Sequence, residues 1–484
     1  MVILMVKSSK NLKAFLKDAS NAANIICSWV KSEKNISVIS HHDADGIAAA
    51  GIITQTLKRL DASFRVRIIK QIDEKTIREL SSENNNPIIF TDLGSSYIDL
   101  FKNYFTDTEI IILDHHPPVG DSFPYLTQVN PHLHGFEGSN EISGAGVAYF
   151  TAKDIDAKNQ DLASLAVIGA LGDLQDKNQD RKLLHLNELI VEDAIKIGSI
   201  KTEVDLVIFG RETKPVHKAL ANTSTPFLPG ISGEEDKCLG FLINLGINLK
   251  KDDEWITLSD LSLKEKRKIF SELVKHYSSK GLPSSIPMNL IGTVYTLINE
   301  DRLKPLRNAR EYASLLNACG RMGKSGLGIS ICVGDRDRAL AEAKELLEDY
   351  RQTIASYMNW LNETKSAITE MKYIYSINGG SYIDEKMLST ITSILTNSPF
   401  LKQEKPVIAR TLSQDGYVKI SGRTSDILTH KGIDLGDIML KASEKYSGRG
   451  GGHNVAAGAQ IPAKYQDSFI DFVDKLVGSS LDSK

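Results

Sequence analysis

Short apolar runs alternate with helical patterns through the first two hundred residues of the chain. The β-branched run at 35–40 predicts a buried strand, and the spacing of apolar positions over 48–60 predicts the helix that follows it. The same features predict further strands at 64–70, 87–91 and 109–113, and a helix buried on all sides at 162–171. Strands that alternate with helices form βαβ units, so we expect an α/β domain with a mostly parallel sheet over residues 1–200.

The middle of the chain, residues 201–334, has a less regular pattern that favours a helical insert. Ser262 and Glu265 have the spacing of a capping box, which predicts the start of a charged helix. A second helix is predicted at 307–319, where Gly320 would end it.

The last third of the chain contains one long helix and a second α/β domain. Over 335–363, apolar residues recur at every seventh position with others offset by three, which favours a long connecting helix over a self-associating coiled coil. Residues 364–484 form the second domain, with strands predicted at 372–377, 406–412 and 417–424.

Composition and charge exclude several classes of protein. With 484 residues, 41% hydrophobic and 25% charged, the chain is neither collagen-like nor mainly disordered. A formal charge of −3 excludes a protein that coats nucleic acid through bulk charge, but it allows a local basic groove. The four cysteines lie far apart without a CxxC pair, which indicates reduced intracellular usage. No apolar stretch approaches the roughly 18 residues of a membrane span, so we expect a soluble cytoplasmic protein without a membrane partner.

Four polar motifs follow predicted strands or the buried helix. They are HHDADG at 41–46, TDLG at 91–94, DHHPP at 114–118 and GD at 172–173. Ligands of such sheets bind outside the carboxyl ends of the strands, so these aspartates and histidine pairs should meet at one mouth. Helix capping by aspartate accounts for one such motif, but not for the paired histidines as well. Carboxylates and imidazoles without thiolates suit Mn²⁺ or Mg²⁺, and two such ions could clamp a phosphodiester and activate water.

A glycine cluster near the C-terminus is a second candidate site. Consecutive glycines at 450–452 let backbone N–H groups approach an anion, and Arg449 and His453 add donors. A flexible surface loop is the alternative. Arg423, at the end of a predicted strand, offers a guanidinium suited to phosphate. Basic runs at 58–70 and 302–310 favour a polyanionic substrate, with ordinary solvated helix faces as the alternative.

In this order, the motifs resemble the four metal motifs of the DHH phosphoesterase superfamily, and GRGGGHNVAAGA resembles the substrate-binding motif of the DHH-associated C-terminal domain. The HHDADG form and NAREYASLLNACGR resemble the archaeal RecJ-like, GINS-associated nucleases, which are related to the RecJ-like subunit of the eukaryotic replicative helicase complex. The resemblance implies a DHH catalytic domain at 1–200 and a DHH-associated substrate-binding domain at 364–484.

The resemblance also implies a role for each candidate residue. The site would bind two Mn²⁺ or Mg²⁺ ions. His41 and Asp43 would be ligands of one ion, and Asp45, His115 and Asp173 would be ligands of the other. Asp92 would bind both ions. His41 and His42 both stay open as the ligand of the first motif. His116 would contact the scissile phosphate, and Asp114 would orient the His116 ring. A neighbouring phosphate would be bound by Arg423, Arg449, Gly450, Gly451, Gly452 and His453.

The function that these features imply is a two-metal phosphodiesterase acting as a single-strand DNA or RNA exonuclease in replication or repair. The two domains would form a cleft that admits one strand and excludes a duplex. One alternative is a phosphodiesterase of short oligonucleotides or cyclic dinucleotides, and another is a RecJ-like replisome scaffold that binds GINS. The expected partners are single-stranded DNA or RNA and, through the resemblance, GINS and the replicative helicase complex.

Overall fold

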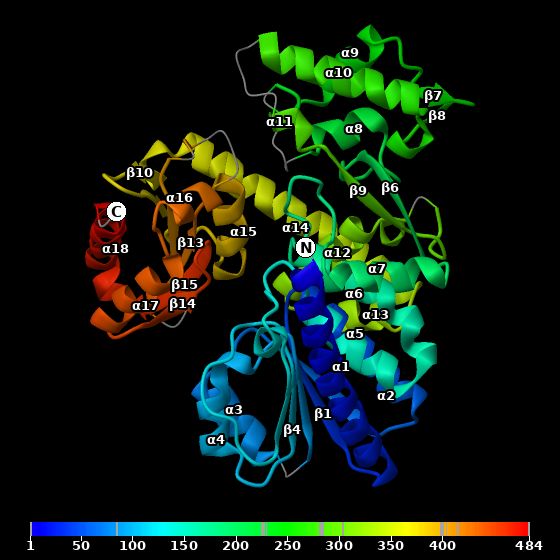
Figure 1. Ribbon diagram of the computed structural model, residues 1–484. Helices are drawn as coiled ribbons and strands as arrows, with labels where there is room; N and C mark the ends of the chain where they lie inside the picture. The colour runs from blue at the N-terminus through cyan, green and yellow to red at the C-terminus, as the bar shows by residue number, and fades with distance from the viewer. Residues whose placement is uncertain are drawn as a thin grey trace. The chain divides into compact units, whose positions relative to one another are not determined.

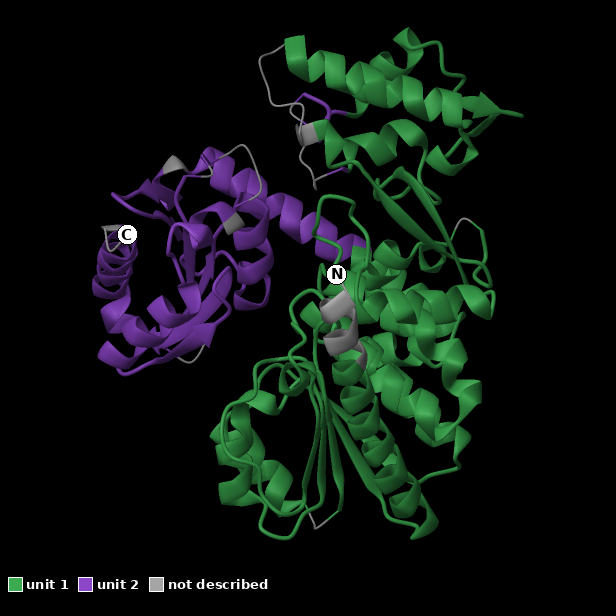
Figure 2. Ribbon diagram, in the orientation of Figure 1, with its two compact units in different colours: residues 1–222, 235–347 green, residues 223–234, 348–484 purple. Residues whose placement is uncertain are grey.

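The computed structural model describes residues 2–83, 86–223, 228, 230–279, 285–302, 304–396, 401–402, 404–413 and 416–482. The chain divides into two compact units, which Figure 2 shows in different colours. The first unit contains residues 1–222 and 235–347, and the second contains residues 223–234 and 348–484. The long helix α14 (Arg338–Glu363) begins in the first unit and ends in the second, and it matches the predicted connecting helix.

A five-stranded parallel sheet forms the centre of the first unit. Its strand order is β2-β1-β3-β4-β5, and all neighbouring strands are parallel. The strands are β1 (Ile36–His41), β2 (Phe64–Ile69), β3 (Ile88–Thr91), β4 (Ile110–Leu113) and β5 (Leu126–Val129). The predicted α/β class and the first four strands are confirmed. The edge strand β5 was not predicted, because three of its four residues are only half-buried and its sequence lacks an apolar run.

Helices cover both faces of this sheet (Figure 1). One face carries α3 (Glu74–Ser82) and α4 (Ile98–Tyr104), whose apolar side chains share a buried core with the strands. The other face carries α1 (Val2–Lys31), α2 (Ala44–Arg59), α5 (Gly144–Ile155) and α6 (Ala163–Gly172). Helix α2 packs against β1, α5 and α6. Helix α6 is buried on nearly all sides, as predicted.

The region at 186–297 is mainly helical, and it also contains a two-stranded antiparallel ribbon that was not predicted. The ribbon pairs β6 (Ile200–Leu206) with β9 (Ile291–Leu297). The other elements here are α7 (Leu186–Lys196), α8 (Val216–Ala221), α9 (Glu235–Asn244), α10 (Leu263–Ser279), α11 (Ser285–Met288) and the hairpin β7 (Lys250–Lys251) with β8 (Glu254–Trp255). Ser262 and Glu265 form the predicted capping box, because each backbone N–H donates to the other side chain.

Helices α12 (Ala309–Arg321) and α13 (Ser325–Cys332) pack against α2. The predicted helix end at Gly320 is wrong, since α12 continues to Arg321 and Gly323, with a φ of +74°, follows it. Gly320 instead permits a close contact. A β-carbon at this position would lie 1.6 Å from the carbonyl oxygen of His42, so only glycine allows α12 to approach the loop after β1.

A six-stranded mixed sheet forms the centre of the second unit, in the order β10-β11-β12-β13-β15-β14. Its strands are β10 (Ile368–Glu370), β11 (Tyr375–Asn378), β12 (Val407–Leu412), β13 (Tyr417–Arg423), β14 (Arg449–Gly452) and β15 (Ala456–Pro462). The helices are α15 (Glu385–Thr396), α16 (Asp426–His430), α17 (Leu435–Lys445) and α18 (Gln466–Asp482). The glycine cluster is therefore an edge strand, β14, and not the loop or nest that the sequence suggested.

Short 3-10 helices complete the described fold, at Ser95–Tyr97, Pro131–His134, Ala157–Leu162, Leu258–Asp260, Pro305–Arg307, Lys365–Ala367 and Ala463–Tyr465. Among the described helices, none has both the length and the apolar character that a membrane crossing requires.

Candidate metal centre

The four polar motifs meet at one end of the parallel sheet in the first unit. His41 is the last residue of β1, and Asp43 caps the N-terminus of α2, where its carboxylate accepts a hydrogen bond from the Gly46 N–H. Asp92 follows β3 directly, His115 follows β4 by two residues, and Asp173 caps the C-terminus of α6. Sequence-distant side chains converge here because parallel strands end at the same edge.

Asp92 lies between two groups of potential ligands. Its Oδ2 is 3.6 Å from Nδ1 of His41, and its Oδ1 is 3.1 Å from Nε2 of His115. The same His41 nitrogen is 2.9 Å from Oδ2 of Asp43. The two oxygens of one nearly buried carboxylate therefore face different potential ligands. Of the first two histidines, His41 belongs to these groups and His42 does not.

Asp45 and Asp173 lie beside His115 on the far side of Asp92. Oδ2 of Asp45 is 3.8 Å from Nε2 of His115, and Oδ2 of Asp173 is 3.9 Å from its Nδ1. The carboxylate of Asp45 also accepts hydrogen bonds from the Gly144 and Ala145 N–H groups at the start of α5, at 2.7 and 3.0 Å. These contacts hold a buried carboxylate at a helix N-terminus, where the helix dipole favours negative charge.

Asp114 contacts and positions the ring of His116. Its Oδ1 lies 2.8 Å from Nδ1 of His116 and accepts the N–H of His115, while its Oδ2 accepts the N–H of Ser95. Asp114 is fully buried, whereas the His116 side chain is 34% exposed. Burial alone would raise the pKa of Asp114, but these partners hold that pKa well below its usual range. An ionised Asp114 thus fixes the ring of His116 toward the accessible side of the site.

The carboxylates of the centre repel one another. Burial and the Asp92 charge raise the pKa of Asp45 well above its usual value. Burial, together with Asp92 and Asp43, raises the pKa of Asp173 to about 6, although His115 acts in the opposite direction. Burial would lower the pKa of His115, but the surrounding aspartates raise it. Four carboxylates around two imidazoles leave an excess of negative charge, which bound cations would balance.

The donor set fits hard divalent cations. Three groups within the described residues bring potential ligand atoms within 4.8 Å of one another. They are His41, Asp43 and Asp92; Asp45, His115 and Asp173; and Asp92, Asp114, His115 and His116. Their donors are carboxylate oxygens and imidazole nitrogens without a thiolate, which suits Mn²⁺ or Mg²⁺.

Polar residues that the sequence analysis missed orient these ligands. The buried Gln175 donates from Nε2 to Oδ2 of Asp173, at 3.0 Å, and to the Gly138 carbonyl, at 2.8 Å. That carbonyl also lies 2.7 Å from Nδ1 of His115. On the other side, the buried Asn130 donates to the carbonyl of His116. In the sequence, Gln175 could have been noticed only because it follows the GD motif by two residues. Nothing in the sequence around Asn130 points to a role at this site.

Glycines allow helices to come unusually close to the ligands. A β-carbon on Gly144 of α5 would lie 2.7 Å from Oδ1 of Asp92, and one on Gly169 of α6 would lie 2.4 Å from Oδ1 of Asp45. Both distances are too short for any other residue, so the two helices fit around the carboxylates only with glycine at these positions.

The second predicted set of residues lies on β13, on β14 and directly after β14 in the sheet of the second unit. Arg423 ends β13 and pairs with Ala456, which begins β15, while Gly452 pairs with Ala457, so β15 lies between Arg423 and the turn from β14 to His453. The guanidinium donates to Ser393 and Ser389 of α15, at 3.0 and 2.7 Å. The side chains of Arg449 and His453 are exposed, but Arg449 pairs with Gln460, which pairs with Lys419, so Arg449 lies toward the opposite end of the strands from Arg423.

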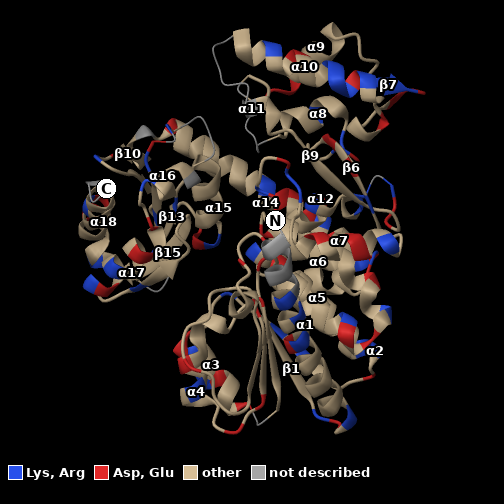
Figure 3. Cartoon of the chain, in the orientation of Figure 1, with Lys and Arg blue, Asp and Glu red and all other residues tan. Residues whose placement is uncertain are grey.

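Several arginines of the two basic runs form ion pairs within the protein. In the first run, Arg59 pairs with Asp161 and Arg67 with Glu79. In the second run, Arg302 pairs with Asp260 and Arg310 with the buried Asp176. Figure 3 accordingly shows basic and acidic residues interspersed along the helices of the first unit.

Comparison with protein families identifies three regions of the chain. The DHH family N-terminal domain matches residues 35–170, the DHH-CID domain matches residues 208–291, and the DHHA1 domain matches residues 370–479. The uncharacterized protein MJ0831 of Methanocaldococcus jannaschii is 32% identical over 92% of this chain and 94% of its own length. The single-stranded-DNA-specific exonuclease RecJ of Bacillus subtilis is 26% identical over 35% of this chain and 23% of its own length.

Two solved structures share the fold over nearly the whole chain. RecJ from Thermus thermophilus in complex with Mn²⁺ matches 96% of this chain with a TM-score of 0.58 and 18% identity, and this chain covers 55% of it. CDC45 from Entamoeba histolytica matches 95% of this chain and 99% of its own length, with a TM-score of 0.64 and 12% identity.

Proposed function

The chain belongs to the DHH family and is RecJ-like, and on this premise we propose that it is a two-metal phosphodiesterase that degrades single-stranded nucleic acid from an end. The observation that carries the proposal is the position of Asp92, whose two carboxylate oxygens face two separate groups of ligands. Two bound Mn²⁺ or Mg²⁺ ions would provide Lewis-acid stabilisation of a phosphodiester and activation of the attacking water.

The residues of the candidate centre would bind the two ions and orient one another. His41 and Asp43 would bind one ion, Asp45, His115 and Asp173 would bind the other, and Asp92 would bind both. Gln175 keeps the Asp173 carboxylate turned toward His115.

His116 is the residue that we propose donates a hydrogen bond to the scissile phosphate. Its Nδ1 lies 2.8 Å from Oδ1 of Asp114, and the proposed donor to the substrate is the other ring nitrogen, Nε2. Because Asp114 fixes the ring orientation, that hydrogen bond would be preorganised where negative charge develops on the phosphate.

The likeness to a single-stranded-DNA-specific exonuclease supports a single strand as the substrate, and Arg423 with the β14 turn is the proposed holder of a neighbouring phosphate. A fork-shaped guanidinium fixed by two serines suits such a role. We propose a role in replication or repair, in the cytoplasm, with GINS as a partner. A pull-down with purified GINS tests the partner, and no retention of GINS would contradict it.

The proposed activity is tested with single strands of DNA and RNA labelled at the 5′ or the 3′ end, digested in the presence of Mn²⁺ or Mg²⁺. We expect stepwise shortening from one end, and no cleavage by the Asp92→Asn and Asp173→Asn variants. Asp180→Asn, which changes an exposed aspartate outside the three ligand groups, is the matched control and should cleave like the wild type.

Two results would contradict the proposal. Cleavage of a dinucleotide or cyclic dinucleotide without degradation of long strands would favour the small-substrate phosphodiesterase instead. Wild-type turnover by Asp92→Asn would remove the proposed metal centre from the reaction.

A further inference from the structure

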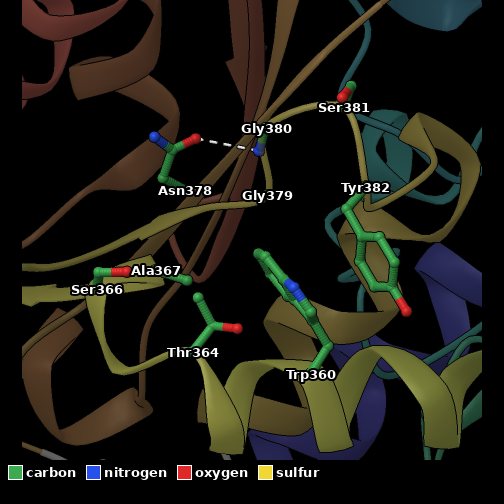
Figure 4. Close-up of a pocket in the computed structure, with 9 residues that line it drawn as sticks. All are labelled: Trp360, Thr364, Ser366, Ala367, Asn378, Gly379, Gly380, Ser381 and Tyr382. Atoms are coloured by element: carbon green, nitrogen blue, oxygen red, sulfur yellow. Dashed lines mark hydrogen bonds between the residues drawn. The ribbon is translucent and has the colours of Figure 1, made fainter.

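A cavity of about 340 Å³, largely open to solvent, lies in the second unit, where the polypeptide leaves β11. Figure 4 shows its lining, which comes from the C-terminal end of α14, the segment before β10 and the loop after β11. The lining residues are Trp360, Thr364, Ser366, Ala367, Asn378, Gly379, Gly380, Ser381 and Tyr382. Because β11 and β12 are parallel and joined through α15, the loop after β11 occupies the position where α/β sheets commonly bind ligands.

Two aromatic rings form one side of the cavity. The rings of Trp360 and Tyr382 are stacked, with centroids 4.9 Å apart and an interplanar angle of 29°. Tyr357 supports Tyr382 edge-on at 5.6 Å. In Figure 4 the indole of Trp360 stands between Tyr382 on one side and Thr364 and Ala367 on the other. A planar ligand in the cavity would therefore extend an existing aromatic stack.

The rest of the lining is polar but uncharged. Among the side chains that the structure describes, none of the nine that line the cavity carries a charge. The hydroxyls of Thr364, Ser366 and Ser381 make no hydrogen bond to any residue that the structure describes, so they can serve a ligand. Uncharged donors and acceptors beside an aromatic face suit a planar heterocycle with polar edges.

The loop that closes the cavity is already held in place. Oδ1 of Asn378 accepts the Gly380 N–H at 3.0 Å, and the Gly380 carbonyl accepts the Leu412 N–H at 2.8 Å and the Thr411 hydroxyl at 2.9 Å. Gly380 has a φ of +54°, which favours glycine. The cavity is therefore formed before any ligand binds, and its volume lies at the lower end of the range for small-molecule sites.

The strand register separates this cavity from the proposed phosphate site of the same unit. Tyr375 at the start of β11 pairs with Val407, which pairs with Arg423, so Arg423 lies at the edge where β11 begins. Asn378, at the end of β11, pairs with Arg410 at the opposite edge. The two places lie at opposite ends of the strands and are distinct sites.

We propose that the cavity binds a nucleobase, stacked on Trp360. A purine or pyrimidine fits the uncharged polar lining, the aromatic face and the size. Two sources share this chemistry, a free nucleoside and a base of a bound single strand. Only the second source rests on the proposed function.

The test is a titration of the full-length chain with a fluorescent base, whose emission falls when the base stacks on an aromatic ring. EDTA is present to remove divalent metal ions. In one arm the probe is 2-aminopurine riboside, and in the other it is a short single strand with one internal 2-aminopurine. We expect saturable quenching in at least one arm, and Trp360→Ala to weaken binding by about tenfold or more, since base–aromatic stacking is worth that much. Trp360→Phe should recover part of the affinity.

Two further variants distinguish a loss of binding at the cavity from a loss of folding in Trp360→Ala. Ser366→Phe adds a ring at an exposed lining position and should block the cavity without removing a buried contact. Trp255→Ala removes a 43% exposed indole in the first unit and should bind the probe like the wild type.

The inference is wrong if neither probe is quenched, or if Trp360→Ala and Ser366→Phe bind as tightly as Trp255→Ala. Quenching in the riboside arm alone identifies a free nucleoside as the ligand, and quenching in the strand arm identifies a base of a strand. Because this experiment measures binding in the absence of metal, its result does not depend on whether the protein has the proposed nuclease activity.

Discussion

Individual side chains at the metal centre depend on partners that are not ligands themselves. Gln175 is the clearest case, because its amide spans the Asp173 carboxylate and the Gly138 carbonyl, while its own oxygen accepts a hydrogen bond from Asn187 at 2.7 Å. A single buried amide thus ties one proposed ligand to the loop that also contacts His115. Such supporting contacts commonly decide how well a metal site binds its ion.

Replacing Gln175 by alanine should weaken Mn²⁺ binding by about 10- to 100-fold, because Asp173 loses the contact that orients it. Isothermal titration calorimetry of the metal-free protein with Mn²⁺ measures the change. Gln160→Ala is the matched control, since Gln160 donates to Asp193 at a distance from the centre, and its affinity should stay unchanged. An equal affinity in both variants would show that Gln175 has no part in positioning Asp173.

Helices approach the centre through glycines at their contact points. Gly169 lies in α6 where that helix meets α2 and α5, and a β-carbon there would lie 2.4 Å from Asp45 Oδ1 and 2.5 Å from the Ala145 β-carbon. The packing of three helices and the position of one carboxylate are therefore set by the same residue.

Gly169→Ala should destabilise the fold by about 1–3 kcal/mol, as overpacking of a core does, and should also reduce the Mn²⁺ affinity by displacing Asp45. Gly326→Ala in α13 is the matched control, because nothing lies within 4 Å of its β-carbon position, and it should leave Mn²⁺ binding unchanged. Urea unfolding and Mn²⁺ titration measure the two effects. If Gly169→Ala matches the control in both measurements, the close contact does not constrain the site.

These contacts also show what the sequence could and could not predict. The buried strands β1, β3 and β4 and the acidic and histidine motifs after them are local patterns, so their convergence follows from the parallel topology. The ribbon of β6 with β9 joins segments about ninety residues apart, so no local pattern predicts it. The edge strands β5 and β14 were missed because their own residues, LTQV and RGGG, lack an apolar run. Gly320 resembled a helix end in sequence, but its requirement is a contact with His42.

At the scale of the whole molecule, the chemistry is divided between two units. The proposed metal ligands all belong to the first unit, whereas Arg423 and the β14 turn belong to the second. The first set would act on the bond that breaks, and the second would hold the strand. Variants in the two units should therefore affect different kinetic constants.

Arg423→Lys should raise KM for a long single strand with little change in kcat, because lysine cannot keep the planar fork that Ser389 and Ser393 fix. Asp173→Asn should instead lower kcat below detection. Arg338→Lys is the matched control, since this arginine on α14 has an 89% exposed side chain and should behave like the wild type. A fall in kcat for Arg423→Lys, with KM unchanged, would place Arg423 in the chemical step rather than in binding.

The most direct measurement of the central claim is an anomalous difference map from crystals of the full chain soaked in Mn²⁺, recorded near the manganese absorption edge. We expect two peaks, roughly 4 Å apart as in two-metal hydrolases. Asp92 should lie between them, His41 and Asp43 should contact one, and Asp45, His115 and Asp173 should contact the other. A single peak, or peaks that do not contact Asp92, would contradict this claim.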